Sequence, residues 1–460
     1  MRSRGQLAAA LAIVVLVVGG GLYVDREVGA RALEAGPPGR APSGAWFCPH
    51  SGGTDWTAEL ELANPGADPV LVRVSNLGTG RPSAPRRWTV DPASTLEVPV
   101  SADGREASSV VEYFGGWVAA SWVEHGGGED TGVAAEPCAP AAGGPWLVAD
   151  ASTLKGDDDE LVVMNPFATA AVISITIYTD RHEPISLEGY THVPIAPFRS
   201  ESFRLNRALG YEAVGARVDV EIGRVAVATL DASKDGGIRS TLGYLGTPPR
   251  TTILPAGFDG GHTSLEVVSS AGGRVEVQGE VLDPTTSVAL SELADTSPPG
   301  GSAQRFQVTT EGPSAIVVNA DGAGLAAGRE TFGISADQGS TVGTGAGAAA
   351  WVVLPAVAGR PNHPGVVLAN PAPVPAEVEL SALPGGSGPP PEPVTLHIPA
   401  GRSVQAPKRW LEIAPGAAVL AIASSGTFVP AAASYSLGRE GYAAYAVALG
   451  VPIPQAWIPS

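Results

Sequence analysis

A short pattern recurs along this 460-residue chain at a nearly constant spacing, and the repeat limits the folds that the chain can adopt. An alternating apolar run that ends in Asn-Pro reads LELANPG at 60–66, LVVMNPF at 161–167 and VLANPA at 367–372. Asn64 and Asn165 are 101 residues apart, and Asn370 follows after 205, which is two periods. Where the missing copy is expected, LEVVSSAGG has Ser269 and Ser270 in place of Asn-Pro.

A second marker keeps the same period. Apolar runs open with Trp46, Trp146, Trp351 and Trp457, and Thr251 opens TTILPAG where the period leaves a gap. These five starts are separated by 100, 105, 100 and 106 residues. Two markers with one period indicate tandem repeats of about one hundred residues. We therefore predict four β repeats, at 46–145, 146–250, 251–350 (a degenerate copy) and 351–460.

Each copy continues in the style of β-strands. Runs such as PVLVRVSNL (69–77) and AVISITIY (171–178) alternate apolar and polar residues, which is the period of a half-buried strand. Seven or eight short strands in a copy of this size favour an antiparallel, immunoglobulin-like β-sandwich. The alternative is a β-propeller with two blades per repeat, in which the terminal AWIPS (456–460) would supply a closing strand.

The Asn-Pro motif has a structural interpretation. A proline cannot donate to a strand ladder, so Pro65, Pro166 and Pro371 are expected to end their strands. The preceding asparagine amide can form hydrogen bonds to the backbone of the turn. The asparagines and prolines of the motif, like the tryptophans, are therefore predicted to be structural markers of the repeat.

The N-terminal segment predicts a membrane anchor. Arg2 and Arg4 precede an uninterrupted apolar run of 18 residues, Leu7 to Val24, which is close to the shortest helix that spans a bilayer. We expect residues 1–30 to form a cytoplasmic stub and a single-pass signal-anchor helix, followed by a Pro/Gly linker at 31–45. The remainder would lie outside the cytoplasmic membrane. A cleaved signal peptide, which would give a secreted protein, is the alternative.

Two cysteines fit an oxidising compartment. Cys48 and Cys138 belong to the first copy, and a disulfide between them would join its first and last strands. Two buried free thiols are the alternative interpretation.

Histidines provide the only recurring candidate for a site. His50, His262 and His363 each follow the first strand of a copy, which could place a site at one end of the architecture. The alternative is that a polar, glycine-rich turn simply tolerates histidine. The sequence contains no catalytic motif, metal-ligand spacing or phosphate-binding loop, so it predicts no catalytic residue, metal or cofactor. The net charge of −18 disfavours nucleic acid as a partner.

An N-terminal anchor, followed by WFCPHSGG, LELANPG and further Trp and Asn-Pro copies, resembles an actinobacterial family of extracytoplasmic proteins of unknown function. The motifs that carry this resemblance are structural. It therefore implies a cell-envelope location and transfers no catalytic residue to this chain.

We expect a non-enzymatic binding or scaffolding module of the cell envelope, tethered to the cytoplasmic membrane by Leu7–Val24. An envelope protein or polysaccharide would be its partner, bound by loops at one end of the domains. Two alternatives remain: a glycan-active hydrolase or lyase on a β-propeller, and a passive structural spacer.

Overall fold

The computed structural model describes residues 43–459 apart from 129, 182, 208–209, 234–236, 256–261, 295–297, 311, 323, 333–337, 355–362, 386–388, 414–415 and 438–442. The expected anchor at Leu7–Val24 and most of the expected linker lie outside the described residues. No helix among the described residues has the length and apolar character that a membrane crossing requires.

Strands account for nearly all the regular structure, as predicted, and they fall into four consecutive segments. The first segment contains β1 (Gly44–Cys48), β2 (Thr57–Asn64), β3 (Val70–Leu77), β4 (Arg86–Val90), β5 (Ser94–Val100), β6 (Ser108–Phe114), β7 (Ala119–Gly126) and β8 (Gly132–Pro137). The second contains β9 (Trp146–Ala151), β10 (Asp157–Asn165), β11 (Ala171–Thr179), β12 (Val193–Ile195), β13 (Arg199–Arg204), η1 (Leu205–Arg207), β14 (Val214–Ile222), β15 (Ala226–Ser233), β16 (Gly237–Leu242) and β17 (Tyr244–Leu245).

The other two segments follow the same plan. The third contains β18 (Thr251–Pro255), β19 (His262–Ser269), β20 (Val277–Leu282), β21 (Ser287–Ala289), α2 (Ser291–Ala294), β22 (Ser302–Val308), β23 (Ala315–Ala320), β24 (Leu325–Phe332) and β25 (Gln338–Val342). The fourth contains β26 (Ala350–Val353), β27 (His363–Asn370), β28 (Ala376–Leu383), β29 (Val394–Ile398), β30 (Arg402–Gln405), α3 (Lys408–Ile413), β31 (Ala418–Ser425), β32 (Val429–Leu437), β33 (Ala443–Leu449), β34 (Val451–Pro452) and η2 (Gln455–Trp457).

Each segment forms two antiparallel sheets with one strand order. In the first segment the sheets are β1-β6-β3-β4 and β5-β2-β7-β8, so the chain passes back and forth between them. The other three segments repeat this order, and β17 and β34 each add a strand beside the first strand of their own segment. Paired antiparallel sheets are compatible with the predicted sandwiches. A propeller blade built from four consecutive strands has a different order.

The expectation of a closing strand at the C-terminus is wrong. Gln455–Trp457 forms a 3-10 helix, and the last strand, β34, pairs with β26 of its own segment. Pro454 and Pro459 flank this helix, and neither has an N–H group to offer a strand ladder.

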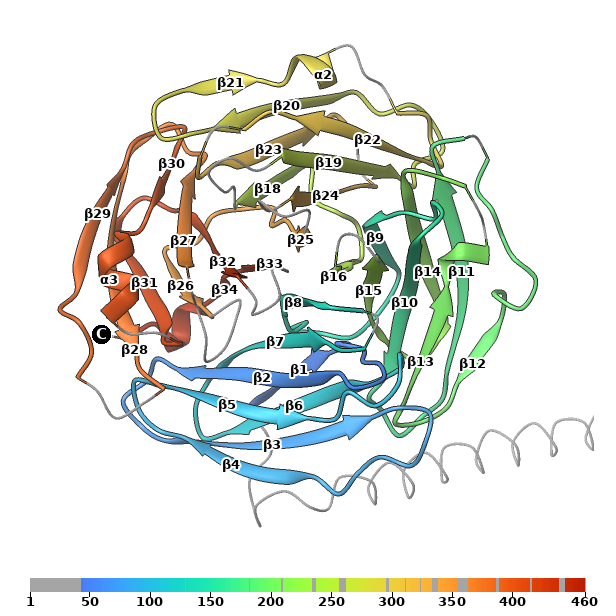
Figure 1. Cartoon of the computed structure of the whole chain (residues 1–460), viewed down its shortest axis with the longest axis horizontal. Coiled ribbons are helices and arrows are strands. Elements are labelled where there is room, and N and C mark those ends of the chain that lie inside the picture. Colours follow the sequence, from blue (N-terminus) through green and yellow to red (C-terminus); the bar gives the residue numbers. More distant parts are fainter. Residues whose placement is uncertain are drawn as a thin grey trace, which may run out of the picture.

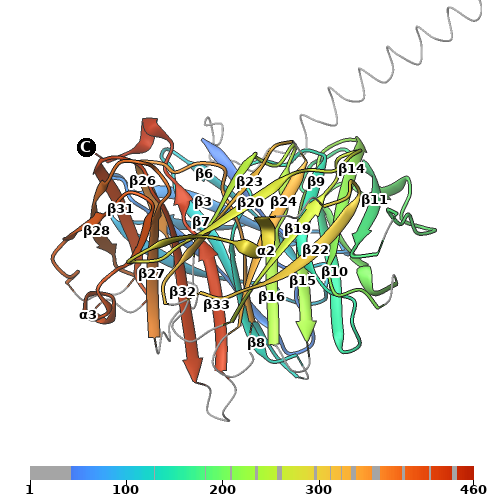
Figure 2. The same ribbon diagram turned by 90° about the horizontal axis from the view of Figure 1, so that it is seen from above.

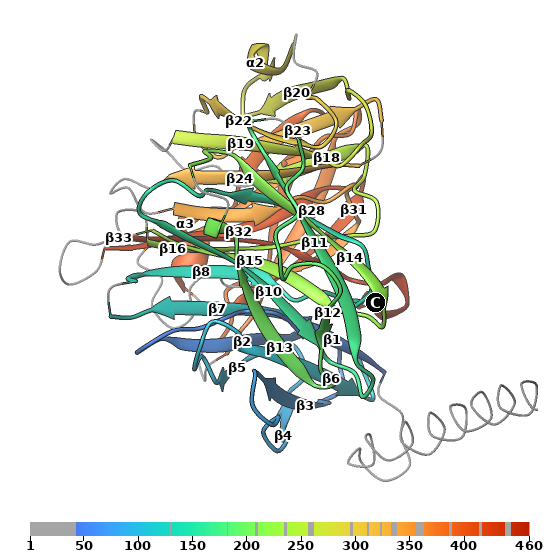
Figure 3. The same cartoon turned by 90° about the vertical axis from the view of Figure 1, so that its right-hand side faces the viewer.

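The four segments surround a central axis. Figure 1 looks down this axis and shows the first segment in blue and teal, the second in green, the third in yellow and the fourth in orange and red. The eighth strand of each segment lies innermost, and β8, β16, β25 and β33 contact one another around the axis. In the side view of Figure 3, β4 and α2 lie at opposite outer edges.

Tryptophans at the start of the segments fill the cores. Trp46, Trp146 and Trp351 are at most 5% exposed. Their indole N–H groups donate to backbone carbonyls, 2.7 Å to Val118, 2.9 Å to Val225 and 3.1 Å to Ala348 respectively. A large buried ring with its polar atom satisfied makes these positions anchors of the core.

The asparagine of the Asn-Pro motif joins the two sheets of its segment. Asn165 Nδ2 donates to the carbonyl groups of Thr169 at 2.8 Å and of Ile195 and Ala196 at 3.1 Å. Its Oδ1 accepts from the N–H of Phe167 at 3.1 Å. Because Asn165 ends β10 and Ile195 ends β12, one amide connects strands of both sheets.

The same bonds recur at the other two copies of the motif. The Nδ2 of Asn64 and of Asn370 donates to the carbonyl four residues later at 2.8 Å and to two carbonyls at the end of the fourth strand. The repetition explains the period of the motif: three of the four copies place one amide where the second strand meets the end of the fourth.

Asn165→Asp tests this contact, because it replaces the donating amide with an oxygen that faces three carbonyl groups. We expect a loss of about 2–3 kcal/mol in the free energy of unfolding, more than for Asn165→Ala. Denaturant unfolding of the full chain measures the loss. Ser269→Ala is the matched control, since the third copy already lacks the amide, and it should cost under about 1 kcal/mol. Equal losses at both positions would contradict this role.

Candidate functional site: an axial apolar pocket

A cavity of about 580 Å³ opens where the four segments meet. Its lining comes from every segment, with residues at 45–46, 113, 117 and 137–141, at 146 and 242–245, at 342–344, and at 449–454. The innermost strands β8, β16, β25 and β33 all end in this lining, and β1 begins there. We call this the proximal end of the molecule and the opposite end the distal end; the strands run between the two in Figure 2.

The lining is uncharged. Five aromatic side chains contribute to it, namely Trp46, Tyr113, Trp117, Trp146 and Tyr244, and the remaining positions carry small or aliphatic residues, proline, threonine and the Cys138 half-cystine. The chain as a whole carries a net charge of −18. An apolar lining with a few hydroxyl groups is typical of a small-molecule pocket.

The wall of the pocket is built by a return of the chain to the first strand of its own segment. After β16, Tyr244 and Leu245 pair with β9, and after β33 the strand β34 pairs with β26. In the first and third segments, isolated β-bridges make the same connection to the first strand. Ala139 pairs with Phe47, and Thr344 pairs with Ile253. Every segment therefore closes on itself beside the axis.

Small residues allow this return. Gly243, Gly343 and Gly450 each follow the eighth strand directly. A Cβ atom on Gly243 would lie 2.9 Å from Val148 and 3.1 Å from Trp146, and one on Gly450 would lie 3.3 Å from Trp351. The chain thus passes too close to the first strand for a side chain. Sequence reasoning missed these glycines, although their spacing of 100 and 107 residues repeats the period of the tryptophans.

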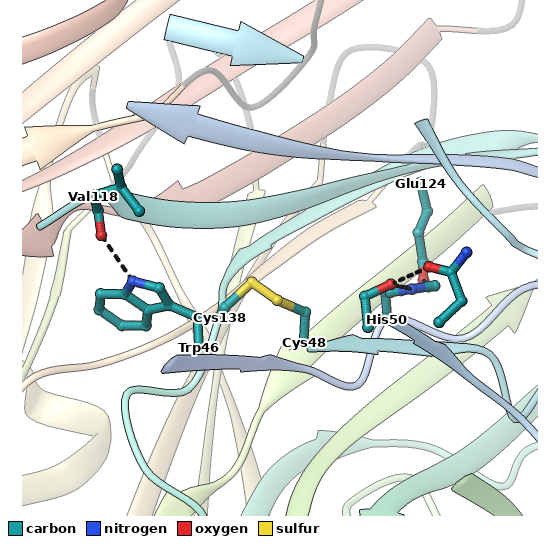
Figure 4. Close-up of a disulfide and its surroundings, with 8 residues drawn as sticks. Trp46, Cys48, His50, Val118, Glu124 and Cys138 are labelled. Carbon is teal, nitrogen blue, oxygen red and sulfur yellow. Dashed lines mark hydrogen bonds and ion pairs between the residues drawn. A yellow bond between two sulfur atoms is a disulfide. The ribbon is translucent and has the colours of Figure 1, made fainter. Parts of the chain in front are cut away.

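In the first segment the position of these glycines is occupied by Cys138. Cys138 forms a disulfide with Cys48 of β1 across a Cα–Cα distance of 4.6 Å, as predicted. Figure 4 shows the bond between Trp46, whose indole points to Val118, and His50. The covalent bond fixes the same return that close backbone packing fixes in the other segments.

Polar groups below the pocket hold the inner strands together. Glu136 of β8 is fully buried, and its Oε1 accepts from the N–H groups of Val342 at 3.0 Å and Leu242 at 3.4 Å. The Tyr244 hydroxyl donates to the carbonyl of Ala327 at 2.6 Å and accepts from the Gly343 N–H at 2.9 Å. Burial raises the pKa of Glu136 well above its ordinary value.

A cluster of buried charges joins the second and third segments. Arg305 of β22 contacts Glu266 at 3.1 Å and Glu330 at 3.0 Å. Arg239 of β16 forms an ion pair with Glu330, so Glu330 bridges the two arginines. Asp150 of β9 approaches both arginines, at 3.6 and 3.9 Å, and its N–H donates to Glu266 at 2.9 Å. These side chains are at most 10% exposed, so we assign the cluster to segment cohesion.

Carboxyl groups of the cluster are harder to ionise than exposed ones. Burial raises the pKa of Glu266 to about 8, although Arg305 opposes the shift. Burial likewise raises the pKa of Asp231, which pairs with Arg239, to about 7. Burial is the larger effect because two arginines cannot replace the water that a group of carboxylates loses.

The three recurring histidines belong to three different segments. His50 is fully buried between the sheets of the first segment, with ring nitrogens 2.8 Å from the carbonyl of Ser51 and 2.9 Å from the Ser109 hydroxyl. Burial lowers the pKa of His50 to about 4, so the ring is neutral at pH 7. His262 and His363 begin β19 and β27. Of these three, His50 has a described side chain, and it does not line the axial pocket.

A second cavity, of about 700 Å³, lies at the distal end of the first segment. Asp55, Asp103 and Asp130 line it together with Arg105 and several glycines. Arg105 pairs with Asp130 at 2.9 Å and stacks over the ring of Trp56 at 4.9 Å. Among the described residues, no group of three or more histidine, cysteine or acidic side chains is arranged to hold a metal ion.

The fold and the pocket define an all-β protein of paired antiparallel sheets with an uncharged cavity on its axis. The chain belongs to DUF5719, a family of unknown function, which matches residues 102–339. This agrees with the resemblance to a family of unknown function that the repeated motifs indicated.

The chain matches no curated protein. Among solved structures, it is similar to a tetra-tandem repeat in the extending region of a large adhesion protein, with 11% identity over 86% of this chain and 95% of that one and a TM-score of 0.11. It is also similar to a Ca²⁺-stabilised adhesin with which an Antarctic bacterium binds ice, with 10% identity over 84% and 94% and a TM-score of 0.11. TM-scores of this size do not show a shared fold.

Removing the disulfide should destabilise the first segment. The bond closes a loop with a sequence separation of 90 residues, for which chain entropy gives a loss of about 4–5 kcal/mol. We expect that loss in the denaturant unfolding of the double variant Cys48→Ser, Cys138→Ser. Reductant should produce a similar loss in the natural chain and no further loss in the double variant, which is the control. If reduction left the unfolding midpoint of the natural chain unchanged, the predicted stabilisation by the disulfide would be wrong.

The raised pKa of Glu266 predicts a loss of stability with rising pH. The folded state holds the proton of Glu266 up to about pH 8, whereas the unfolded chain releases it near 4.5. This contribution is therefore complete below about pH 4.5 and is lost as pH rises to 8, with a slope of up to about 1.4 kcal/mol per unit. Glu266→Gln should flatten the slope of unfolding free energy between pH 5 and 8. Glu379→Gln, at an exposed site in β28, should leave it unchanged; equal slopes in all three proteins would refute the prediction.

Proposed function

We propose that this chain is a non-enzymatic module of the cell envelope, tethered to the cytoplasmic membrane by Leu7–Val24, which binds an apolar ligand. In this proposal the four segments are tandem immunoglobulin-like sandwiches. The observation that supports it best is the uncharged pocket at the proximal end. Its lining provides no acid, base or metal ligand, and its aromatic side chains suit binding rather than chemistry.

The position of the pocket fits a membrane tether. The described chain begins at Ser43, whose N–H donates to the Tyr113 carbonyl at 2.8 Å, and Tyr113 lines the pocket. Eighteen residues, 25–42, separate Ser43 from the end of the apolar run. Fully extended, that many residues reach at most about 65 Å. The tether would therefore keep the proximal end within that distance of the bilayer.

The alternative of a glycan-active enzyme would have to use the distal cavity. Glycoside hydrolysis needs a protonated carboxyl group opposite a carboxylate, and burial is the usual means of keeping a carboxyl group protonated. Asp55 and Asp103 are exposed, and Asp130 is already paired with Arg105. The distal cavity therefore favours an open polar surface over a catalytic pair.

The compartment can be tested through the disulfide. We expect the full chain in cells to sediment with membranes after a carbonate wash, with Cys48 and Cys138 oxidised. The double variant Val14→Arg, Val18→Arg places two charges in the apolar run, which costs about 5–7 kcal/mol of insertion. It should remain soluble, with both cysteines reduced and therefore labelled by a thiol reagent once the protein is denatured, since both are buried in the fold. A natural chain found soluble with reduced cysteines would overturn the proposal. Val288→Glu, at an exposed position of β21, is the control and should fractionate like the natural chain.

A further inference from the structure

We propose that the axial pocket receives one hydrocarbon chain of a membrane lipid. This inference rests on the proposed function, since it takes its ligand from the membrane to which the protein is tethered. It is carried by the chemistry of the lining, by its depth at the meeting point of four segments, and by apolar side chains exposed around the same end of the molecule.

The lining excludes a charged or strongly polar ligand. A buried charge without a partner is costly, and none of the residues that line the pocket could pair with one. The inserted part of the ligand must therefore be neutral and apolar. A volume of about 580 Å³ lies within the range of about 300–1,000 Å³ that holds small molecules, which suits an acyl chain better than a folded peptide segment.

Three large apolar side chains are exposed at the same end of the molecule. Leu245 lines the pocket and is 39% exposed, and Trp457, three residues beyond the lining residue Pro454, is 42% exposed. Ile222 is 62% exposed at the end of β14, beyond the position where Val218 pairs with Trp146. Exposed tryptophan and aliphatic side chains around an opening are suited to the lipid–water interface, where an acyl chain can leave the bilayer without crossing water.

The pocket is also preformed. The disulfide at Cys138, the Glu136 bonds to Leu242 and Val342, and the Tyr244 bonds hold its wall. A wall fixed before binding lowers the entropic cost of taking up a flexible chain.

The test uses the purified full chain reconstituted in phosphatidylcholine vesicles that contain a phospholipid with a diazirine near the middle of one acyl chain. After illumination, mass spectrometry should find the lipid on peptides that carry Trp117 or Tyr244. The variant Leu245→Glu places a charge at the pocket mouth, at a residue exposed enough for the fold to tolerate it, and should reduce this labelling at least fivefold. Val288→Glu, the same change at a 55% exposed site in β21, should leave the labelling unchanged.

Several outcomes would overturn the inference. Labelling confined to 1–42 would show that no acyl chain enters the pocket. Labelling of the pocket peptides that Leu245→Glu does not reduce would show that the label arises without entry through the pocket mouth, and it would also overturn the inference. Native mass spectrometry gives a second measurement, and the natural chain should retain one lipid per protein more often than Leu245→Glu does. If the protein fractionates with membranes but its pocket stays unlabelled, the inference fails while the tether stands. A soluble, reduced protein in cells would contradict the proposed function instead.

Discussion

The return of the chain from the innermost strand to the first strand of the same segment is the contact on which the architecture depends. It closes each segment beside the axis, and it requires that the two backbones nearly touch. Three segments meet this requirement with glycine, at Gly243, Gly343 and Gly450, and the first meets it with the Cys48–Cys138 bond. A side chain at Gly243 or Gly343 would meet residues of the first strand and force the return away from it.

The repeat period revealed the features that each segment needs for itself. Trp46 and its counterparts fill a core, and Asn64 and its counterparts join two sheets, so both recur in the first, second and fourth segments. The disulfide could be predicted for the same reason, because both cysteines lie in one copy. The strand content follows from local alternation and was foreseen. The pairing of strands was not, because consecutive strands such as β14 and β15 lie in different sheets of their segment. Ring closure was not, because no local pattern records which segment lies beside which.

The charged cluster shows why contacts between segments resist prediction. Glu124, Asp231 and Glu330 occupy the sixth position of β7, β15 and β24, so their spacing keeps the repeat. Their partners do not: Glu124 lies 3.8 Å from His50 of its own segment, whereas Glu330 binds Arg239 of the neighbouring one. The buried acid therefore recurs with the repeat, whereas its partner does not: it is the neutral His50 ring for Glu124 and the Arg239 guanidinium for Glu330. Buried pairs of this kind fix a specific arrangement more than they add stability.

The axial pocket follows from the same geometry. Four segments that each end their innermost strand at the same end of the ring leave a space between those ends, and the small residues required by the return keep it open. Most lining positions belong to a first strand or to the return of the chain beside it, where apolar side chains pack. A chain that carries many acidic groups thus presents an uncharged cavity at the end where its described part begins. That contrast in polarity separates the axial cavity from the charged periphery, which is suited to water.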